Sequence, residues 1–187
     1  MNTAFVFDPT GNYKLVGKIR DQGQMPTPGL RYVASVTGPY KVFQVVTFEA
    51  LAELGDQLDS LPGGGGSEDP PNAITKGGGA AKVRRSTYLA HTALVRINVR
   101  VPDPATLLTA IGEVIGVDED GDPEADVVAG DFDILACVVA DDEGELHQKI
   151  LDLRRIDGVK RTVSLLVMDY VSTSENAPDD HRVLPAG

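Results

Sequence analysis

Two short turns carry the side chains in this sequence that are best suited to binding a small molecule. Gly130-Asp131-Phe132-Asp133 places two carboxylates within four residues. They can receive an ammonium group, or they can cap backbone amides of the turn itself, and the turn chemistry alone accounts for the sequence. The counterpart in the first half is Gly38-Pro39-Tyr40-Lys41, which lacks both acidic residues. If the turn contacts an ammonium group, we expect this first copy to have lost that capacity.

Two hydroxyl groups near the start of the last predicted strand belong to Thr162 and Ser164. They can hydrogen-bond a carboxylate, or they can be ordinary strand residues, and the sequence favours neither interpretation. With the residues of the two turns they complete the predicted ligand-binding set, which is Gly130, Asp131, Phe132, Asp133, Thr162, Ser164, Gly38 and Tyr40.

Catalytic and metal-binding patterns are not recognised in the sequence. His91, His147 and His181 are far apart and show no ligand spacing. His91, between two predicted strands, is the one histidine with some interest as a catalytic residue or haem ligand. The acidic run 118–124 lacks the twelve-residue ligand pattern of a calcium loop. We therefore expect no metal, no cofactor and no enzymatic activity.

Charge and apolar content restrict the partners that we expect. The 187 residues carry a formal net charge of −11, which disfavours contact with nucleic-acid phosphates or an anionic membrane surface. The single cysteine, Cys137, lies in an apolar run and is predicted to be a buried structural thiol. The sequence shows no signal peptide, and its apolar runs fall short of the roughly 18 residues of a membrane span. A cytoplasmic location is expected.

The order of elements in the second half predicts a ferredoxin-like β-α-β-β-α-β module. Alternation of apolar and polar residues indicates a strand over 92–101, and Asp103-Pro104 is typical of a helix start. Asp142 and Glu145 have the spacing of a capping box before a second helix. The remaining elements are a hairpin with arms at 126–129 and 134–140, and a final strand over 159–171.

The first half repeats the middle of this module. Gly38 and Gly130 lie 92 residues apart, and the apolar residues that follow each turn match at the same offset without a gap. The matched pairs are Val42 with Ile134, Phe43 with Leu135, Val45 with Cys137, Val46 with Val138, Leu54 with Leu146, Leu58 with Ile150 and Leu61 with Leu153. A match across a hairpin and a helix indicates an internal duplication.

The two copies are expected to differ in two places. Two predicted strands, Tyr13–Asp21 and Arg31–Thr37, are separated only by a Pro- and Gly-rich stretch, so the first helix of the first module is predicted to be missing or reduced. A Gly-rich segment then delays the last strand, placed at 83–90. The predicted divisions are module 1 at 1–61 plus 83–90, a flexible insert at 62–82, module 2 at 91–171, and a flexible tail at 172–187.

At two motifs the second half resembles the effector-binding domain of the Lrp/AsnC transcription regulators. These are the Gly130-Asp131-Phe132-Asp133 turn and the Gly158-Val159-Lys160-Arg161-Thr162 entry into the last strand. The resemblance implies an α+β fold in which tandem ferredoxin-like modules form a pseudo-dimeric α/β barrel. It also implies binding of amino-acid effectors near the turn and assembly into oligomers. The family's DNA-binding helix-turn-helix is not recognised in residues 1–60.

Three functions follow as hypotheses. The first is a stand-alone module that binds a small, amino-acid-like effector and associates with itself or a partner protein, without contacting nucleic acid or membrane. The second is a dimeric α/β barrel enzyme, either a cofactor-free monooxygenase or a haem protein. The third is a structural protein of a larger assembly.

Overall fold

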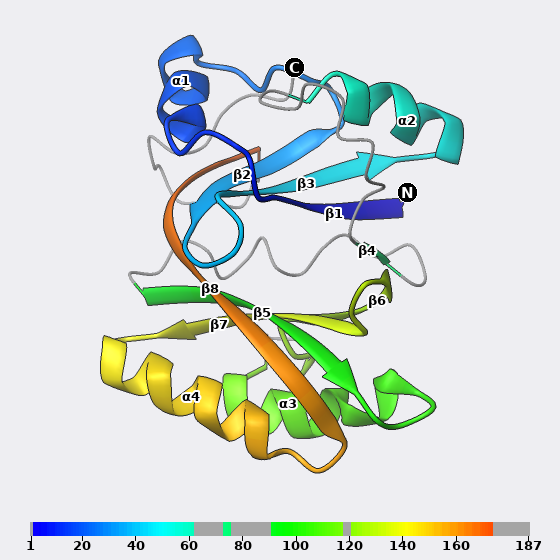
Figure 1. Cartoon of the computed structure of the whole chain (residues 1–187), viewed down its shortest axis with the longest axis vertical. Coiled ribbons are helices and arrows are strands. Elements are labelled where there is room, and N and C mark those ends of the chain that lie inside the picture. The colour runs from blue at the N-terminus through cyan, green and yellow to red at the C-terminus, as the bar shows by residue number, and fades with distance from the viewer. Residues whose placement is uncertain (1, 62–72, 76–90, 118–120, 174–187) are drawn as a thin grey trace.

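The computed structural model describes residues 2–61, 73–75, 91–117 and 121–173 (Figure 1). The first module contains β1 (Asn2–Asp8), α1 (Leu15–Gln22), β2 (Leu30–Val36), β3 (Val42–Phe48), α2 (Leu51–Asp59) and β4 (Ala73–Thr75). The second contains β5 (His91–Val99), the 3-10 helix η2 (Pro104–Leu107), α3 (Leu108–Ile115), β6 (Ala125–Gly130), β7 (Ile134–Ala140), α4 (Glu143–Arg155) and β8 (Val159–Ser172). Both modules follow the β-α-β-β-α-β order, which confirms the predicted α+β fold class.

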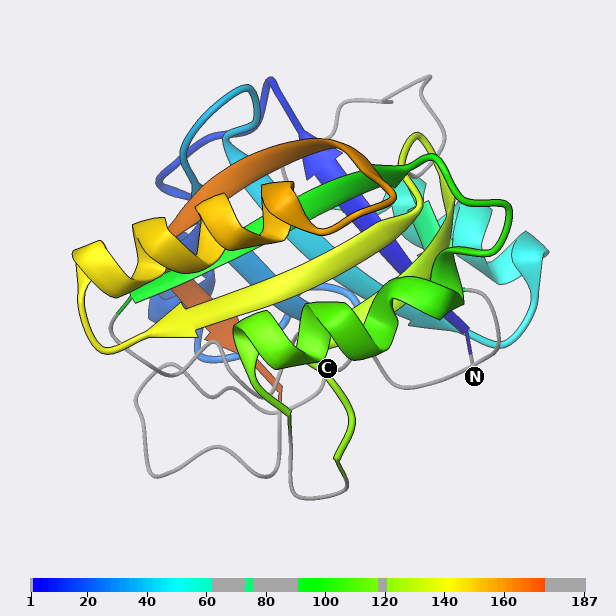
Figure 2. The same ribbon diagram turned by 90° about the horizontal axis from the view of Figure 1, so that it is seen from below.

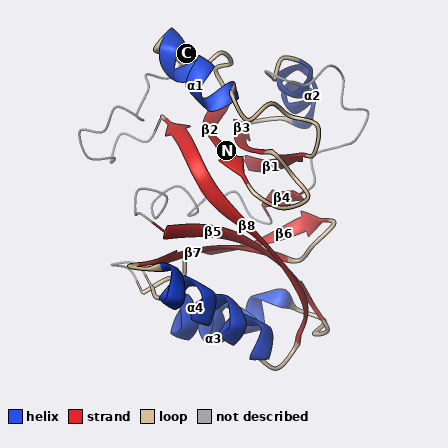
Figure 3. Cartoon of the chain, turned by 60° about the vertical axis from the view of Figure 1, so that its left-hand side comes forward, coloured by secondary structure: helices blue, strands red, loops and turns tan. Residues whose placement is uncertain are grey.

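The strands of the two modules close into one barrel, in the order β1-β3-β2-β8-β5-β7-β6-β4. Each module's fourth strand pairs with the second strand of the other, so that β8 lies against β2 and β4 lies against β6. Figure 3 shows β8 running from the lower sheet into the upper one. This exchange leaves no open sheet edge among the paired strands and makes one chain the equivalent of a dimer.

Helices cover the outside of the barrel, and three apolar clusters fill the layers. α1 and α2 lie on the first sheet, and α3 and α4 lie on the second (Figures 1 and 2). One cluster lies under each helical pair, and the third, which includes Phe43, Leu94 and Tyr170, fills the barrel itself. No helix in the described ranges is long and apolar enough to cross a membrane.

The first module differs from the prediction in its first strand and helix. Residues 2–8 form β1, and most of the predicted strand Tyr13–Asp21 is the helix α1. Leu15, Val16 and Ile19 are buried at helical spacing, and Gly23 ends the helix with a φ of 72°. The first helix is therefore present, and the prediction that it is missing or reduced is wrong, because Leu15, Val16 and Ile19 recur at helical spacing.

The fourth strand of the first module also needs a correction. Residues 73–75, inside the predicted flexible insert 62–82, form β4 and pair with both β1 and β6. These two pairings supply backbone hydrogen bonds on both sides of a strand that is only three residues long. The predicted strand at 83–90 lies outside the described residues. The predicted tail 172–187 begins too early, because Ser172 belongs to β8 and Thr173 donates its amide to the carbonyl of Arg31, while its residues from 174 onward lie outside the described residues.

Local sequence signals in the second module are confirmed. Asp103 accepts a hydrogen bond from the amide of Ala105 at the start of η2. Asp142 accepts one from the amide of Glu145, while the Glu145 carboxylate accepts one from the amide of Asp141. The duplication is also visible in the structure, because β3 and β7 begin 92 residues apart, as do Leu54 and Leu146, which are both buried.

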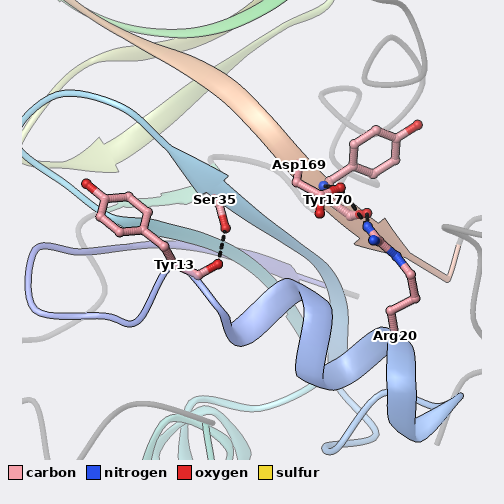
Figure 4. A network of polar contacts seen from close by, with 5 residues as sticks. All are labelled: Tyr13, Arg20, Ser35, Asp169 and Tyr170. Carbon is pink, nitrogen blue, oxygen red and sulfur yellow. Dashed lines mark hydrogen bonds and ion pairs between the residues drawn. The ribbon is translucent and has the colours of Figure 1, made fainter.

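A polar link ties α1 of the first module to β8 of the second (Figure 4). Arg20 Nη2 lies 2.6 Å from Asp169 Oδ1, and the same carboxylate oxygen accepts a hydrogen bond from the amide of Tyr170. Before the N-terminal end of the helix, Ser35 Oγ of β2 donates to the carbonyl of Tyr13 at 2.9 Å. The first contact holds α1 on β8, and the second holds the start of the helix on β2.

Candidate functional site

The two predicted turns meet in the structure around one buried arginine. The Arg96 guanidinium lies 4.5 Å from the ring centroid of Phe132, 5.0 Å from that of Tyr40 and 5.1 Å from that of Phe7. Tyr40 and Phe132 occupy equivalent positions in the two turns, 92 residues apart. Cation–π contacts of this kind are worth about 0.5–2 kcal/mol each, the larger value applying to desolvated pairs.

Arg96 and Phe7 are themselves equivalent positions of the duplicated barrel. Phe7 pairs with Phe43 across the first sheet, and Arg96 pairs with Leu135 across the second. Phe43 and Leu135 are 92 residues apart, so the pseudo-symmetry puts a cation in one module where the other has an aromatic ring. The four side chains form one cluster, referred to below as the arginine cluster: Phe7, Tyr40, Arg96 and Phe132.

The positive charge of Arg96 has little polar compensation among the described residues. The residue is 9% exposed, and Nη1 donates a hydrogen bond to the Tyr40 hydroxyl. Nε is buried without a hydrogen-bond partner, and no carboxylate in the described ranges forms an ion pair with the guanidinium. Burying a charge without a counter-charge is costly, and the three aromatic rings offset only part of that cost.

The two carboxylates of the Gly130-Asp131-Phe132-Asp133 turn have different environments. Asp133 Oδ2 accepts a hydrogen bond from the amide of Val99 at 2.8 Å. This carboxylate therefore caps a backbone amide, which is one of the two roles that the sequence suggests. Asp131 is exposed, and its carbonyl accepts a hydrogen bond from the Asn98 side chain at 3.1 Å. Since Asn98 follows Arg96 by two residues on β5, Asp131 lies at the same end of the barrel as the arginine cluster.

The first turn lies against β8. Gly38 has a φ of 94°, and a Cβ atom at this position would lie 3.1 Å from Leu165 Cδ2. Thr37 donates its amide to the Leu166 carbonyl and accepts the Leu166 amide on its hydroxyl. These contacts hold the turn over the barrel and direct Tyr40 toward Arg96.

Thr162 and Ser164 lie on the other face of the second sheet. Thr162 pairs with Ile97 and Ser164 pairs with Val95, two residues whose side chains pack in the cluster beneath α3 and α4. The Thr162 hydroxyl accepts a hydrogen bond from Arg154 Nε at 2.9 Å. The structure thus does not bring these two hydroxyl groups together with the turn residues.

Cys137 points into the barrel and is 2% exposed. Burial, together with the nearby charge of Glu124, raises the pKa of its thiol far above the ordinary value. The thiol is thus suited to packing rather than to nucleophilic or metal chemistry, as the sequence predicts.

A groove of about 740 Å³ opens on the outer side of the second module, between α4 and β8. The polar residues that line it are Thr37, His91, Thr92, Glu143 and His147. The groove also contacts Gly144 and the apolar residues Leu146, Ile150, Leu166, Val167 and Met168. Within the described ranges no group of three His, Cys, Asp or Glu side chains is arranged to hold a metal ion.

Sequence reasoning missed Arg96 and this groove. The signal for Arg96 was an arginine within an alternating strand, but its phase alone does not show whether the residue faces a barrel or solvent. The groove combines residues from 37 to 168, so it depends on the barrel exchange. His91 was singled out in the sequence, and it lies in the groove with His147, which is exposed.

Comparison with known proteins supports the resemblance found in the sequence. Residues 92–177 match the family described as Lrp/AsnC ligand binding domain. The matched residues span the second module, in agreement with the resemblance predicted from its two motifs. Among curated proteins, none matches the chain.

The chain is similar to several solved structures, including the following two. The siroheme decarboxylase NirDL in complex with an iron-uroporphyrin III analogue has 8% sequence identity and a TM-score of 0.51. That match covers 90% of this chain and 71% of the other. The protein TTHA0845 from Thermus thermophilus has 29% identity and a TM-score of 0.32, covering 43% of this chain and 95% of its own.

The prediction that the chain is not an enzyme is contradicted by the first of these structures. A decarboxylase shares the fold over 90% of this chain. The prediction relied on the lack of a recognisable catalytic motif in the sequence. A shared fold at 8% identity does not transfer the reaction, but it shows that this architecture accommodates catalysis.

Proposed function

We propose that the chain binds a small, amino-acid-like effector at the barrel end where its two turns meet. The observation that carries this proposal is the buried Arg96 guanidinium, which has no carboxylate partner among the described residues. A ligand carboxylate would supply the missing counter-charge through charge-assisted hydrogen bonds. The effector-binding type of the second module supports the same assignment.

Asp131 is the candidate partner for the effector's ammonium group. It is exposed at the same end of the barrel, whereas the Asp133 carboxylate is engaged by the Val99 amide. A guanidinium and a carboxylate at one barrel end match the opposite charges of a zwitterionic amino acid. The first turn contributes Tyr40 but no acidic residue, so we propose one working site in each chain.

The arginine cluster also suggests how a bound effector would change the protein. Phe7 and Tyr40 come from the first module, and Arg96 and Phe132 come from the second. A ligand that draws the guanidinium away from the rings would alter the contact between modules. We propose that such a shift changes association with another copy or with a partner protein.

Isothermal titration calorimetry with each of the twenty amino acids tests the proposal. We expect one chemical class to bind, and we expect Arg96→Met and Asp131→Asn each to weaken that binding at least tenfold. Arg161→Met, at an exposed arginine on β8, is the matched control and should leave the affinity unchanged. Binding that survives both variants, or no binding by any amino acid, would overturn the proposed site.

Turnover is distinguished from binding by following the bound amino acid with NMR. A constant ligand spectrum over hours supports an effector role. New resonances that depend on intact Arg96 would instead assign a reaction to this site.

A further inference from the structure

The groove between α4 and β8 is a second site, which adjoins the first turn at Thr37 but contains none of the residues of the arginine cluster. His91 pairs with Ala140 at one end of the β5–β7 ladder, whereas Ile97 pairs with Ile134, beside the turn, at the other. We propose that this groove binds an uncharged, mainly apolar small molecule. The inference does not depend on the proposed effector site, because the two share no residues.

The walls of the groove expose large apolar side chains to water. Leu166 and Met168 are 45% and 54% exposed, although most large apolar residues of the described chain are buried. Both side chains line the groove, opposite Leu146 and Ile150 of α4. Apolar side chains left open to water beside a cavity of this size are typical of a ligand site.

The polar groups of the groove are suited to a ligand without charge. The imidazole nitrogens of His91 and His147 can form hydrogen bonds with a ligand. Such groups fix the orientation of a ligand whose body is held by the apolar walls.

The surrounding charge disfavours an anion. Glu143 lines the groove, and none of the described residues lining it is Lys or Arg. Asp141, Asp142 and Glu145 stand beside Glu143 at the start of α4, in a chain with a net charge of −11. An anionic ligand would meet this negative field, whereas an uncharged ligand would not.

Two fluorescent probes that differ by one sulfonate group test the proposal. N-phenyl-1-naphthylamine is uncharged, and 8-anilinonaphthalene-1-sulfonate is its anionic analogue. We expect the uncharged probe to bind the full chain with a dissociation constant at least tenfold lower than that of the sulfonate. Equal or tighter binding of the sulfonate would overturn the inference about charge.

Substitutions locate the probe. Leu166→Asp combined with Met168→Asp should weaken binding of the uncharged probe at least tenfold. Met168→Asp alone should weaken it by a smaller factor. Val117→Asp is the matched control, because Val117 is an apolar residue with 57% exposure outside the groove. If all variants bind the probe equally, the groove is not its site and the inference fails.

A second copy of the chain is the competing occupant. Light scattering of the wild type and the double variant distinguishes the two cases. A monomeric wild type that binds the probe supports the small-molecule site. A dimer that excludes the probe and is dissociated by the double variant would assign the groove to protein association instead.

Discussion

At the residue scale, Phe132 connects the predicted turn to the interior of the barrel. Its ring is 1% exposed and lies edge-on to Phe7, with centroids 5.7 Å apart, as well as against Arg96. Replacement by alanine removes these contacts and leaves a cavity beside a charged group.

We expect Phe132→Ala to lower the free energy of unfolding by about 3–5 kcal/mol. Urea denaturation followed by circular dichroism measures the change. Tyr13→Ala is the control, since Tyr13 is 47% exposed and its truncation should cost less than about 0.5 kcal/mol. A loss for Phe132→Ala no larger than that of the control would contradict the buried position of the ring.

Gly38 is the residue whose conformation holds the first turn against β8. Alanine at this position must adopt a φ of 94° and place its Cβ 3.1 Å from Leu165 Cδ2. We expect Gly38→Ala to destabilise the protein by about 1–3 kcal/mol. Thermal denaturation at fixed pH gives the measurement.

The matched control for this substitution is Gly55→Ala. Gly55 lies within α2, and a Cβ there would meet nothing within 4 Å. Alanine should therefore stabilise the helix by about 0.5–1 kcal/mol. The two substitutions are expected to change the free energy of unfolding in opposite directions. A destabilising effect at both would contradict the specific requirement for glycine in the turn.

At the element scale, the second module could be predicted from the sequence because its signals are local. Asp103 and Asp142 cap the elements that follow them, as their positions suggest. The first strand and helix of the first module were misassigned because Tyr13–Asp21 was given strand character. β4 could not be predicted, since three residues beside a Gly-rich run form a strand only through partners far away in the sequence.

Glu145 makes the start of α4 sensitive to acid. The hydrogen bond from the Asp141 amide, followed by the contact with Lys149, lowers the pKa of its carboxyl below the ordinary value. A carboxyl with a lowered pKa in the folded state stabilises the protein above its unfolded pKa of about 4.3. That contribution is lost as the pH falls through the folded pKa.

Glu145→Gln therefore tests the capping box through pH. We expect the variant to be less stable than the wild type at pH 7, and the difference to shrink below about pH 4. Urea midpoints at pH 7 and pH 3 provide the comparison. Glu113→Gln, the same substitution at an exposed position on α3, is the matched control. A Glu145→Gln difference that grows toward low pH would reverse the assigned sign.

At the scale of the whole molecule, the two modules depend on each other for their core. The barrel cluster combines Phe5, Tyr32 and Phe43 from the first module with Leu94 and Leu135 from the second. Pairing of β8 with β2, and of β4 with β6, closes the sheet on both sides. A domain that shares both hydrogen bonds and core is expected to unfold as one cooperative unit.

A chain containing only residues 91–187 tests this dependence. Alone, it would expose the edges of β6 and β8 and the barrel face of its sheet. A second copy could cover them by pairing β8 with β6, the equivalent of β2 at an offset of 92 residues. That arrangement would bring two copies of Arg96 into one barrel.

We therefore expect this half-chain to lack a stable folded monomer and either to aggregate or to form a dimer less stable than the full chain. In the full chain the first module provides Phe7 opposite Arg96, whereas a homodimer would place a second buried cation there, at a cost in desolvation. Light scattering over a range of concentrations, combined with urea denaturation, measures both mass and stability. A half-chain that is monomeric and unfolds with the full chain's midpoint would show that the modules are independent, and that the shared barrel is not what stabilises them.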